Sequence, residues 1–153
     1  MSSTHSGLFV HAVFAVKYRN AVLEKGWRGD VYKYMAGILK RHNHHPILIN
    51  GVEDHVHLLY GAPPNIDSSK MMQLLKANSS KWINEQKLTT KKFQWQRGFG
   101  VYSTCISQLQ NTKEYIANQE ERHKKTTFLD EYRSILDLFG IEIDERDLFK
   151  PLQ

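Results

Sequence analysis

The chain has one cysteine among its 153 residues, Cys105. A single thiol cannot form an internal disulfide, so we expect a fold held by its hydrophobic core in a reducing cytoplasm. Cys105 has no cationic neighbour of the kind that activates a thiol, and we interpret it as a packing residue.

Long apolar runs are also absent. The longest, Leu8 to Val16, is interrupted by His11 and is far too short to cross a bilayer. No charged-then-apolar signal segment precedes it, so we expect no association with a membrane. The polar connection at 87–92 brings no shift in composition, and residues 1–153 are therefore expected to form one domain.

The charge is unbalanced towards the basic side. The net charge is +5 and the sequence pI is about 9.3. A polyanionic partner is favoured, although basic composition alone does not identify one.

Apolar periodicity predicts the order strand, helix, strand, strand, helix, strand. The expected strands cover 8–16, 47–52, 55–60 and 101–106, and the expected helices cover 26–42 and 67–87. This order is typical of the ferredoxin-like, or split βαβ, plan of the α+β class. We expect a four-stranded antiparallel sheet with two helices on one face, and extra C-terminal helices.

Finer details of the helices follow from the same patterns. The buried stripe of the second helix is expected to be Met71, Leu74, Leu75, Asn78 and Trp82. A third helix should run from Ser107 to about Arg122, because Ser107 and Gln110 match a capping box. A further helix should bury Phe128, Leu129, Tyr132, Ile135, Leu136 and Phe139 and end at Gly140. A short extension at 141–143 and a turn at 144–149 would finish the chain.

The first strand is apolar on both faces, which is typical of a central strand covered by helices. His11 interrupts it. A satisfied, buried histidine is the favoured interpretation, and a residue lining a site is the second.

A His-x-His motif lies in the third expected strand. Side chains on a strand alternate between faces, so His55 and His57 share a face and their rings can converge on one point. Two imidazoles on a rigid strand are a good start for a divalent-metal site if another residue supplies an oxygen. Two polar residues on a half-exposed strand would give the same spacing.

A second pair of residues lies on the third helix. Tyr115 and Gln119 are four apart, so they project from the same helix face, one with a phenol and the other with an amide oxygen that can ligate a hard cation. Taken alone, the pair is equally typical of an exposed surface.

Basic residues gather in two places. Lys17 to Asn20 is a basic turn that could hold phosphate and stack a base on Tyr18, although a solvated loop explains it equally well. The second helix carries Lys70, Lys76 and Lys81, a plausible row of phosphate contacts.

Several segments are informative in combination. They are His11 to Arg19, Asp54 to Leu59, Leu75 to Trp82, Gly98 to Ser103, and Tyr115 to Gln119 with the following residues to His123. In this order they make the chain resemble the HUH-type single-tyrosine transposases of small bacterial insertion sequences, the IS200-like family. That family often has a second histidine where this chain has Arg122, a departure that leaves the core chemistry untouched.

The resemblance implies a chemistry for the two pairs. His55 and His57 would bind Mg²⁺ or Mn²⁺ with Gln119 as the third protein ligand. Tyr115 would attack phosphorus in single-stranded DNA and leave a 5′-phosphotyrosine and a free 3′-hydroxyl. An unperturbed tyrosine has a pKa of about 10 and needs help to lose its proton, and the sequence identifies no base for it.

The resemblance also implies partners. The family works as a homodimer in which the tyrosine helix of one subunit can complete the metal site of the other, with Gly98, Gly100 and the Tyr115 helix as the expected places of exchange. The DNA would be a hairpin at the end of the element. Candidate DNA contacts, chosen by charge and position, are Lys17, Arg19, Lys76 and Lys81.

The sequence leaves three other functions open. A non-catalytic nucleic-acid-binding module would need no tyrosine, and a metal-dependent nuclease using water would release a product without attached protein. A domesticated relative that processes hairpins of its host genome would use the same active site.

Overall fold

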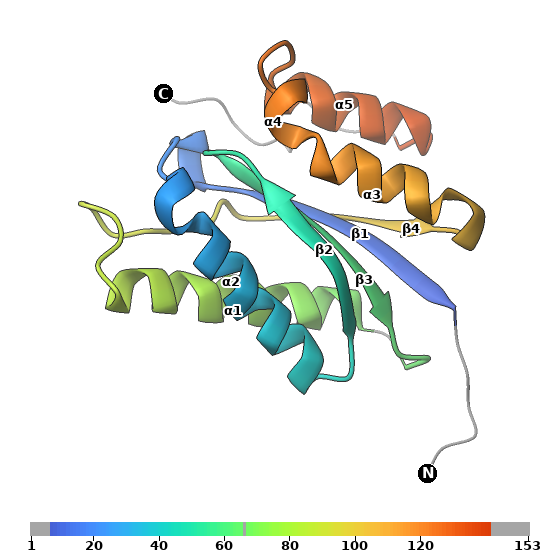
Figure 1. Ribbon diagram of the computed structural model, residues 1–153, viewed down its shortest axis with the longest axis horizontal. Coiled ribbons are helices and arrows are strands. Elements are labelled where there is room, and N and C mark those ends of the chain that lie inside the picture. Colours follow the sequence, from blue (N-terminus) through green and yellow to red (C-terminus); the bar gives the residue numbers. More distant parts are fainter. Residues whose placement is uncertain (1–6, 66, 142–153) are drawn as a thin grey trace.

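The computed structural model describes residues 7–65 and 67–141. Its centre is an antiparallel sheet with the strand order β2-β3-β1-β4 (Figure 1). The strands are β1 (Leu8–Ala15), β2 (His45–Gly51), β3 (His55–Ala62) and β4 (Gly100–Thr104). β1 is paired on both edges and buried from Val10 to Ala15, which confirms the prediction of a central strand.

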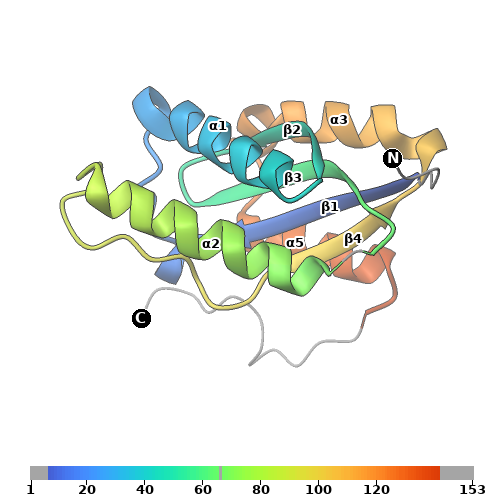
Figure 2. The same cartoon turned by 90° about the horizontal axis from the view of Figure 1, so that it is seen from below.

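One face of the sheet is covered by α1 (Lys25–Arg41) and α2 (Ser68–Glu85), which lie next to one another in Figure 2. The main core lies between them and the sheet, where Ala12 and Phe14 of β1 meet Val56, Leu58 and Tyr60 of β3. The predicted ferredoxin-like class is therefore confirmed.

The buried stripe of α2 agrees with the prediction at Met71 and Leu75 and differs at its other positions. Its fully buried residues are Met71, Met72, Leu75, Ser79 and Ile83. Trp82, which the prediction placed in this stripe, lies on the side of α2 that meets α1. Its ring stacks on that of Tyr34, with the two ring centres 5.2 Å apart. Ser79 can face the core because its hydroxyl donates to the carbonyl of Leu75 and accepts from the Trp95 indole at 2.9 Å.

The opposite face of the sheet is covered by α3 (Leu109–Ala117), α4 (Gln119–Arg122) and α5 (Phe128–Leu138), coloured orange to red in Figure 1. The expected continuous helix from Ser107 is wrong in two respects. A 3₁₀ turn at Ile106–Gln108 precedes α3, and no side chain caps the N-terminus of the helix, so the capping box does not form.

The second difference is a break at Asn118, between the two residues expected to share one helix. Its backbone leaves the helical region (φ −95°, ψ 20°). The side chain of Asn50 in β2 donates to the carbonyls of Ile116 and Ala117 at 2.9 and 3.3 Å, and so caps α3 from the sheet.

The last predicted elements can be compared only in part. α5 ends at Leu138, and Gly140 follows with a positive φ of 66°, as expected of a helix-terminating glycine. Most of the expected extension at 141–143 and all of the turn at 144–149 lie outside the described residues. No helix within the described ranges has the length and apolar character needed to cross a membrane.

Candidate functional site

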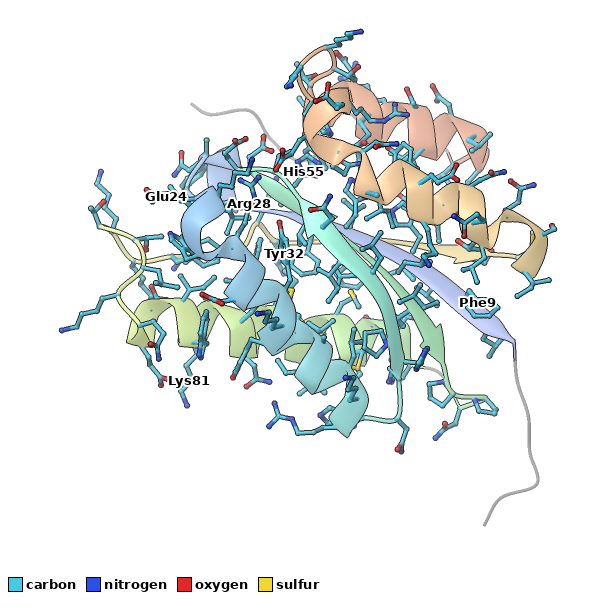
Figure 3. All side chains as sticks on the ribbon, viewed as in Figure 1. Phe9, Glu24, Arg28, Tyr32, His55 and Lys81 are labelled. Carbon is cyan, nitrogen blue, oxygen red and sulfur yellow. The ribbon has the colours of Figure 1, made fainter. Side chains whose placement is uncertain are left out.

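The histidine pair lies on the sheet face below α3, α4 and α5. His55 and His57 alternate with Val56 and Leu58, which point into the main core, so both imidazoles face the other side. Both side chains are completely buried. Figure 3 shows His55 at the end of the sheet, near Arg28 of α1.

Neighbouring side chains orient both imidazoles. His55 Nδ1 lies 2.7 Å from a carboxylate oxygen of Asp54, so this nitrogen carries a proton and donates it. His57 Nδ1 lies 2.8 Å from Nε2 of His11, on the adjacent central strand. His11 is thus a satisfied, buried histidine that also supports the site. The Nε2 atoms of both histidines are left to face one point, as in metal sites where a second group holds each ligating histidine.

That point is occupied by a carboxylate that sequence reasoning missed. Oε1 of Glu131, from α5, lies 3.3 Å from Nε2 of His55 and 3.1 Å from Nε2 of His57. His123 Nε2 approaches the same oxygen at 3.0 Å. Burial alone would raise the pKa of Glu131, but the hydrogen bonds from these three imidazoles outweigh it and hold the pKa far below its usual range.

A signal for Glu131 was present in the sequence. It lies three residues after Phe128 and four before Ile135, within the apolar stripe of an amphipathic helix. A carboxylate at a core position needs a partner, because burying an unpaired charge is costly.

The tyrosine and the amide meet the same carboxylate. The Tyr115 hydroxyl donates to Oε2 of Glu131, and Nε2 of Gln119 donates to that oxygen at 3.1 Å. The amide oxygen of Gln119 lies 3.2 Å from Nε2 of His55. The four residues expected to act together therefore converge within one chain, with Glu131 among them.

The electrostatic environment of Tyr115 works against its ionisation. Burial and the adjacent charge of Glu131 raise the pKa of the phenol above its usual value. The guanidinium of Arg122 lies over the ring, 4.3 Å from its centre, and acts in the opposite direction. The phenol is thus neutral and held in place by a hydrogen bond.

The position of α4 is set by a buried arginine. Arg28 of α1 is almost fully buried, and its Nη2 lies 2.8 Å from a carboxylate oxygen of Glu120. Its Nη1 also donates to the carbonyl of Leu23 at 3.1 Å. Glu120 is next to Gln119 in the sequence. The ion pair therefore links the segment that carries Gln119 to α1, which lies on the other face of the sheet.

The donor set fits a divalent cation. In the part of the chain that the structure describes, one group of three metal-ligating side chains is found, namely His55, His57 and Glu131, with ligand atoms all within 4.8 Å of one another. Two imidazoles and one carboxylate are a common ligand set for divalent transition metals such as Mn²⁺. The amide oxygen of Gln119 is close enough to His55 to be an alternative oxygen donor.

The predicted DNA contacts do not all lie together. Lys17 and Lys76 line one depression of about 370 Å³, together with Arg97. Lys76 is partly engaged there, because its ammonium donates to the carbonyls of Gln96 and Gly98 at 2.6 and 2.8 Å. Lys81 lies outside this depression and pairs with Glu85, and the side chain of Arg19 is outside the described part of the structure.

The expectation for Cys105 is wrong. It is exposed rather than packed, with Sγ 3.1 Å from the hydroxyl of Ser107, because β4 ends at Thr104 and the chain turns outward.

Comparisons with known proteins give one matching family model and structures of similar fold. The family model described as "Transposase IS200 like" matches residues 4–119. A candidate transposase from Deinococcus radiodurans R1 has a similar structure, with a TM-score of 0.63, 21% identity, and coverage of 78% of this chain and 95% of that one. A REP-associated tyrosine transposase bound to a REP hairpin has a TM-score of 0.60 and 13% identity, over 80% of this chain and 74% of that one. No curated protein sequence matches the chain.

Proposed function

This chain belongs to the IS200-like transposase family, and we propose that it cuts and rejoins single-stranded DNA at the ends of an insertion sequence through a 5′-phosphotyrosine intermediate. The observation that carries the proposal is the meeting of Tyr115 with His55 and His57 around the carboxylate of Glu131. A phenol next to a ligand set suited to a cation supports nucleophilic attack by tyrosine on a phosphodiester.

In the cleavage step, the Tyr115 hydroxyl gives up its proton, its oxygen forms a bond to phosphorus, and the bond from phosphorus to the 3′ oxygen breaks. The 3′ oxygen leaves as a hydroxyl after taking up a proton, and the phosphate stays joined to the tyrosine. Because one ester replaces another, the bond energy is kept for the reverse attack by a 3′-hydroxyl, which rejoins the strand.

The chain's own residues prepare this step. Glu131 orients the phenol, and Arg122 places a positive charge against its ring. A divalent cation held by His55, His57 and an oxygen of Glu131 or Gln119 would supply the further positive charge that favours the phenolate and polarises the phosphate. We propose Mg²⁺ or Mn²⁺ as that cation.

Basic residues that line two depressions would hold the DNA backbone. Arg122 and Lys125 lie beside Tyr115 around a depression of about 500 Å³, and Lys17 and Lys76 line the other depression. Phosphate contacts of this kind position DNA without reading its sequence. The relative bound to a REP hairpin supports a folded DNA hairpin as the ligand here, with Lys17, Arg19, Lys76 and Lys81 as proposed contacts.

We further propose a homodimer, which rests on the family resemblance alone. The convergence of Tyr115 with His55, His57 and Gln119 within one chain means that the site can assemble without a partner. An exchange of the tyrosine helix between subunits would then reproduce the same contacts rather than create new ones.

The test uses single-stranded DNA from the flanks of the protein's own gene, labelled at its 3′ end and incubated with the protein and Mn²⁺. A denaturing gel should show label that migrates with the protein, because the tyrosine takes the 5′ phosphate of the labelled fragment. Tyr115→Phe should abolish both the adduct and the cut while DNA binding survives.

Tyr34→Phe is the matched control. It removes the hydroxyl of a tyrosine on α1 and keeps the ring that stacks on Trp82 between α1 and α2. It should form the adduct at the wild-type rate. A cut fragment without attached protein would instead indicate a nuclease that uses water, and binding without any cut would indicate a non-catalytic module.

A further inference from the structure

A second cavity, of about 350 Å³, opens beside Tyr115 on the side away from Arg122. It lies between β4, α3 and α5, and its inner walls are mostly apolar, with the buried ring of His11 among them. The ring of Phe139 stacks on Tyr102 with centres 4.9 Å apart and planes 28° apart, and Ile135 and Leu138 complete this wall.

The outer rim of the same cavity is polar. Asn111 donates from its amide nitrogen to the amide oxygen of Gln108 at 3.1 Å, so the two side chains are held side by side. Within the described residues, the amide nitrogen of Gln108 and the amide oxygen of Asn111 have no hydrogen-bond partner of their own. The rim therefore presents one free donor and one free acceptor next to an aromatic wall.

We propose that this cavity holds the base of a nucleotide adjacent to the scissile phosphate, and so helps to select where the strand is cut. The inference rests on the proposed function, because Tyr115 forms one wall of the cavity and would face that phosphate. Bases stack on aromatic side chains and are read by paired donors and acceptors from Asn and Gln. The volume is near the lower end of the range for ligand sites, which suits a single nucleotide and excludes a duplex.

The only cysteine of the chain reports on this cavity. Cys105 lines it and is exposed, so the rate at which iodoacetamide alkylates the protein, measured by intact mass, measures access to the cavity. The Tyr115→Phe variant is used with Mn²⁺ and the oligonucleotide that the wild type cuts, so that the complex stays uncut.

Alkylation should slow by about tenfold when the oligonucleotide is present at roughly ten times its Kd. Two further oligonucleotides carry an abasic site, one immediately before the cut and the other immediately after it. One of the two should restore fast alkylation, because it lacks the base that fills the cavity, and the other should protect Cys105 as the intact oligonucleotide does. Equal protection by both abasic oligonucleotides, no protection at all, or slow alkylation in the absence of DNA would each overturn the inference. The last result would mean that another part of the protein already fills the cavity.

A variant with altered base recognition gives an independent test. Gln108→Ala should reduce a wild-type preference of about tenfold among the four bases at that position to nearly none, while the adduct still forms. Gln110→Ala is the matched control, because this exposed glutamine on α3 does not line the cavity and pairs with Glu114. An adduct formed by the wild type equally with all four bases would overturn this inference alone, whereas a wild type that forms no adduct would overturn the proposed function.

Discussion

Replacing Glu131 by glutamine should separate the stability of the site from its affinity for metal. The carboxylate is 1% exposed and accepts hydrogen bonds from His55, His57 and His123. A hydrogen bond to a charged group contributes about 1 kcal/mol more than one between neutral groups. Because Glu131→Gln replaces a charged acceptor by a neutral side chain in three such bonds, it should lower the free energy of unfolding of the metal-free protein by about 3 kcal/mol. For a chain of this size that is a fall in Tm of roughly 6–12 °C.

The change in Tm on addition of Mn²⁺ is the sharper test. At a concentration of 100 times its Kd, a ligand adds about 2.7 kcal/mol to stability, or roughly 5–11 °C in Tm. Even supporting residues of metal sites change affinity by 10–100-fold when they are replaced. If Glu131 is a ligand, affinity in the variant should fall by about 100-fold and the same Mn²⁺ concentration should add only about 0.4 kcal/mol.

The measurement is thermal unfolding with and without Mn²⁺ after treatment with EDTA. Glu121→Gln is the matched control, because its side chain is 74% exposed and its ion pair is with Lys124 rather than with the histidines, and it should keep the wild-type response. A Mn²⁺ shift in Glu131→Gln equal to or larger than that of the wild type would refute the reasoning. The oxygen ligand would then be Gln119, as the family resemblance implies.

Two further predictions concern the hairpin that carries the histidines. Burial disfavours a charged His55, but its hydrogen bonds to Asp54 and Glu131 outweigh this and raise its pKa from 6.5 to about 9. The stability from this shift is present below pH 6.5 and is lost as the pH rises towards 9. Urea unfolding of the metal-free protein at both pH values should therefore show a smaller loss for Asp54→Asn than for the wild type, and equal losses would contradict this. Gly51→Ala should destabilise by about 2 kcal/mol or more, since its Cβ would lie 2.2 Å from the carbonyl oxygen of His55. Gly37→Ala, in open space on α1, should not destabilise in the same assay.

Strand periodicity was enough to predict the geometry of the imidazole pair. The period of two fixes the face of each side chain once a strand is recognised, so His55 and His57 had to point the same way. The identity of the supporting groups was harder to predict. Asp54 is adjacent in sequence, but His11 reaches His57 only through the pairing of β1 with β3.

Helical spacing was a weaker guide. Tyr115 and Gln119 were placed together by their spacing, although the helix breaks between them at Asn118. The break depends on Asn50, a residue 66 positions away from Ile116, and no local pattern contains it. Glu131 was overlooked for the opposite reason, because its local pattern does mark a core position but a glutamate on a helix is usually solvated.

The sheet and its C-terminal cover differ in how firmly they are anchored. The imidazoles belong to β3, and His11 to β1, and both strands have partners on each edge. Tyr115 belongs to α3, in which only Ile116 is buried. Backbone amides of the two inner strands should therefore exchange with deuterium only when the whole protein unfolds, while those of α3 exchange through small local openings. Tyr115 can thus move through local openings of α3 while the imidazole pair on the inner strands keeps its position.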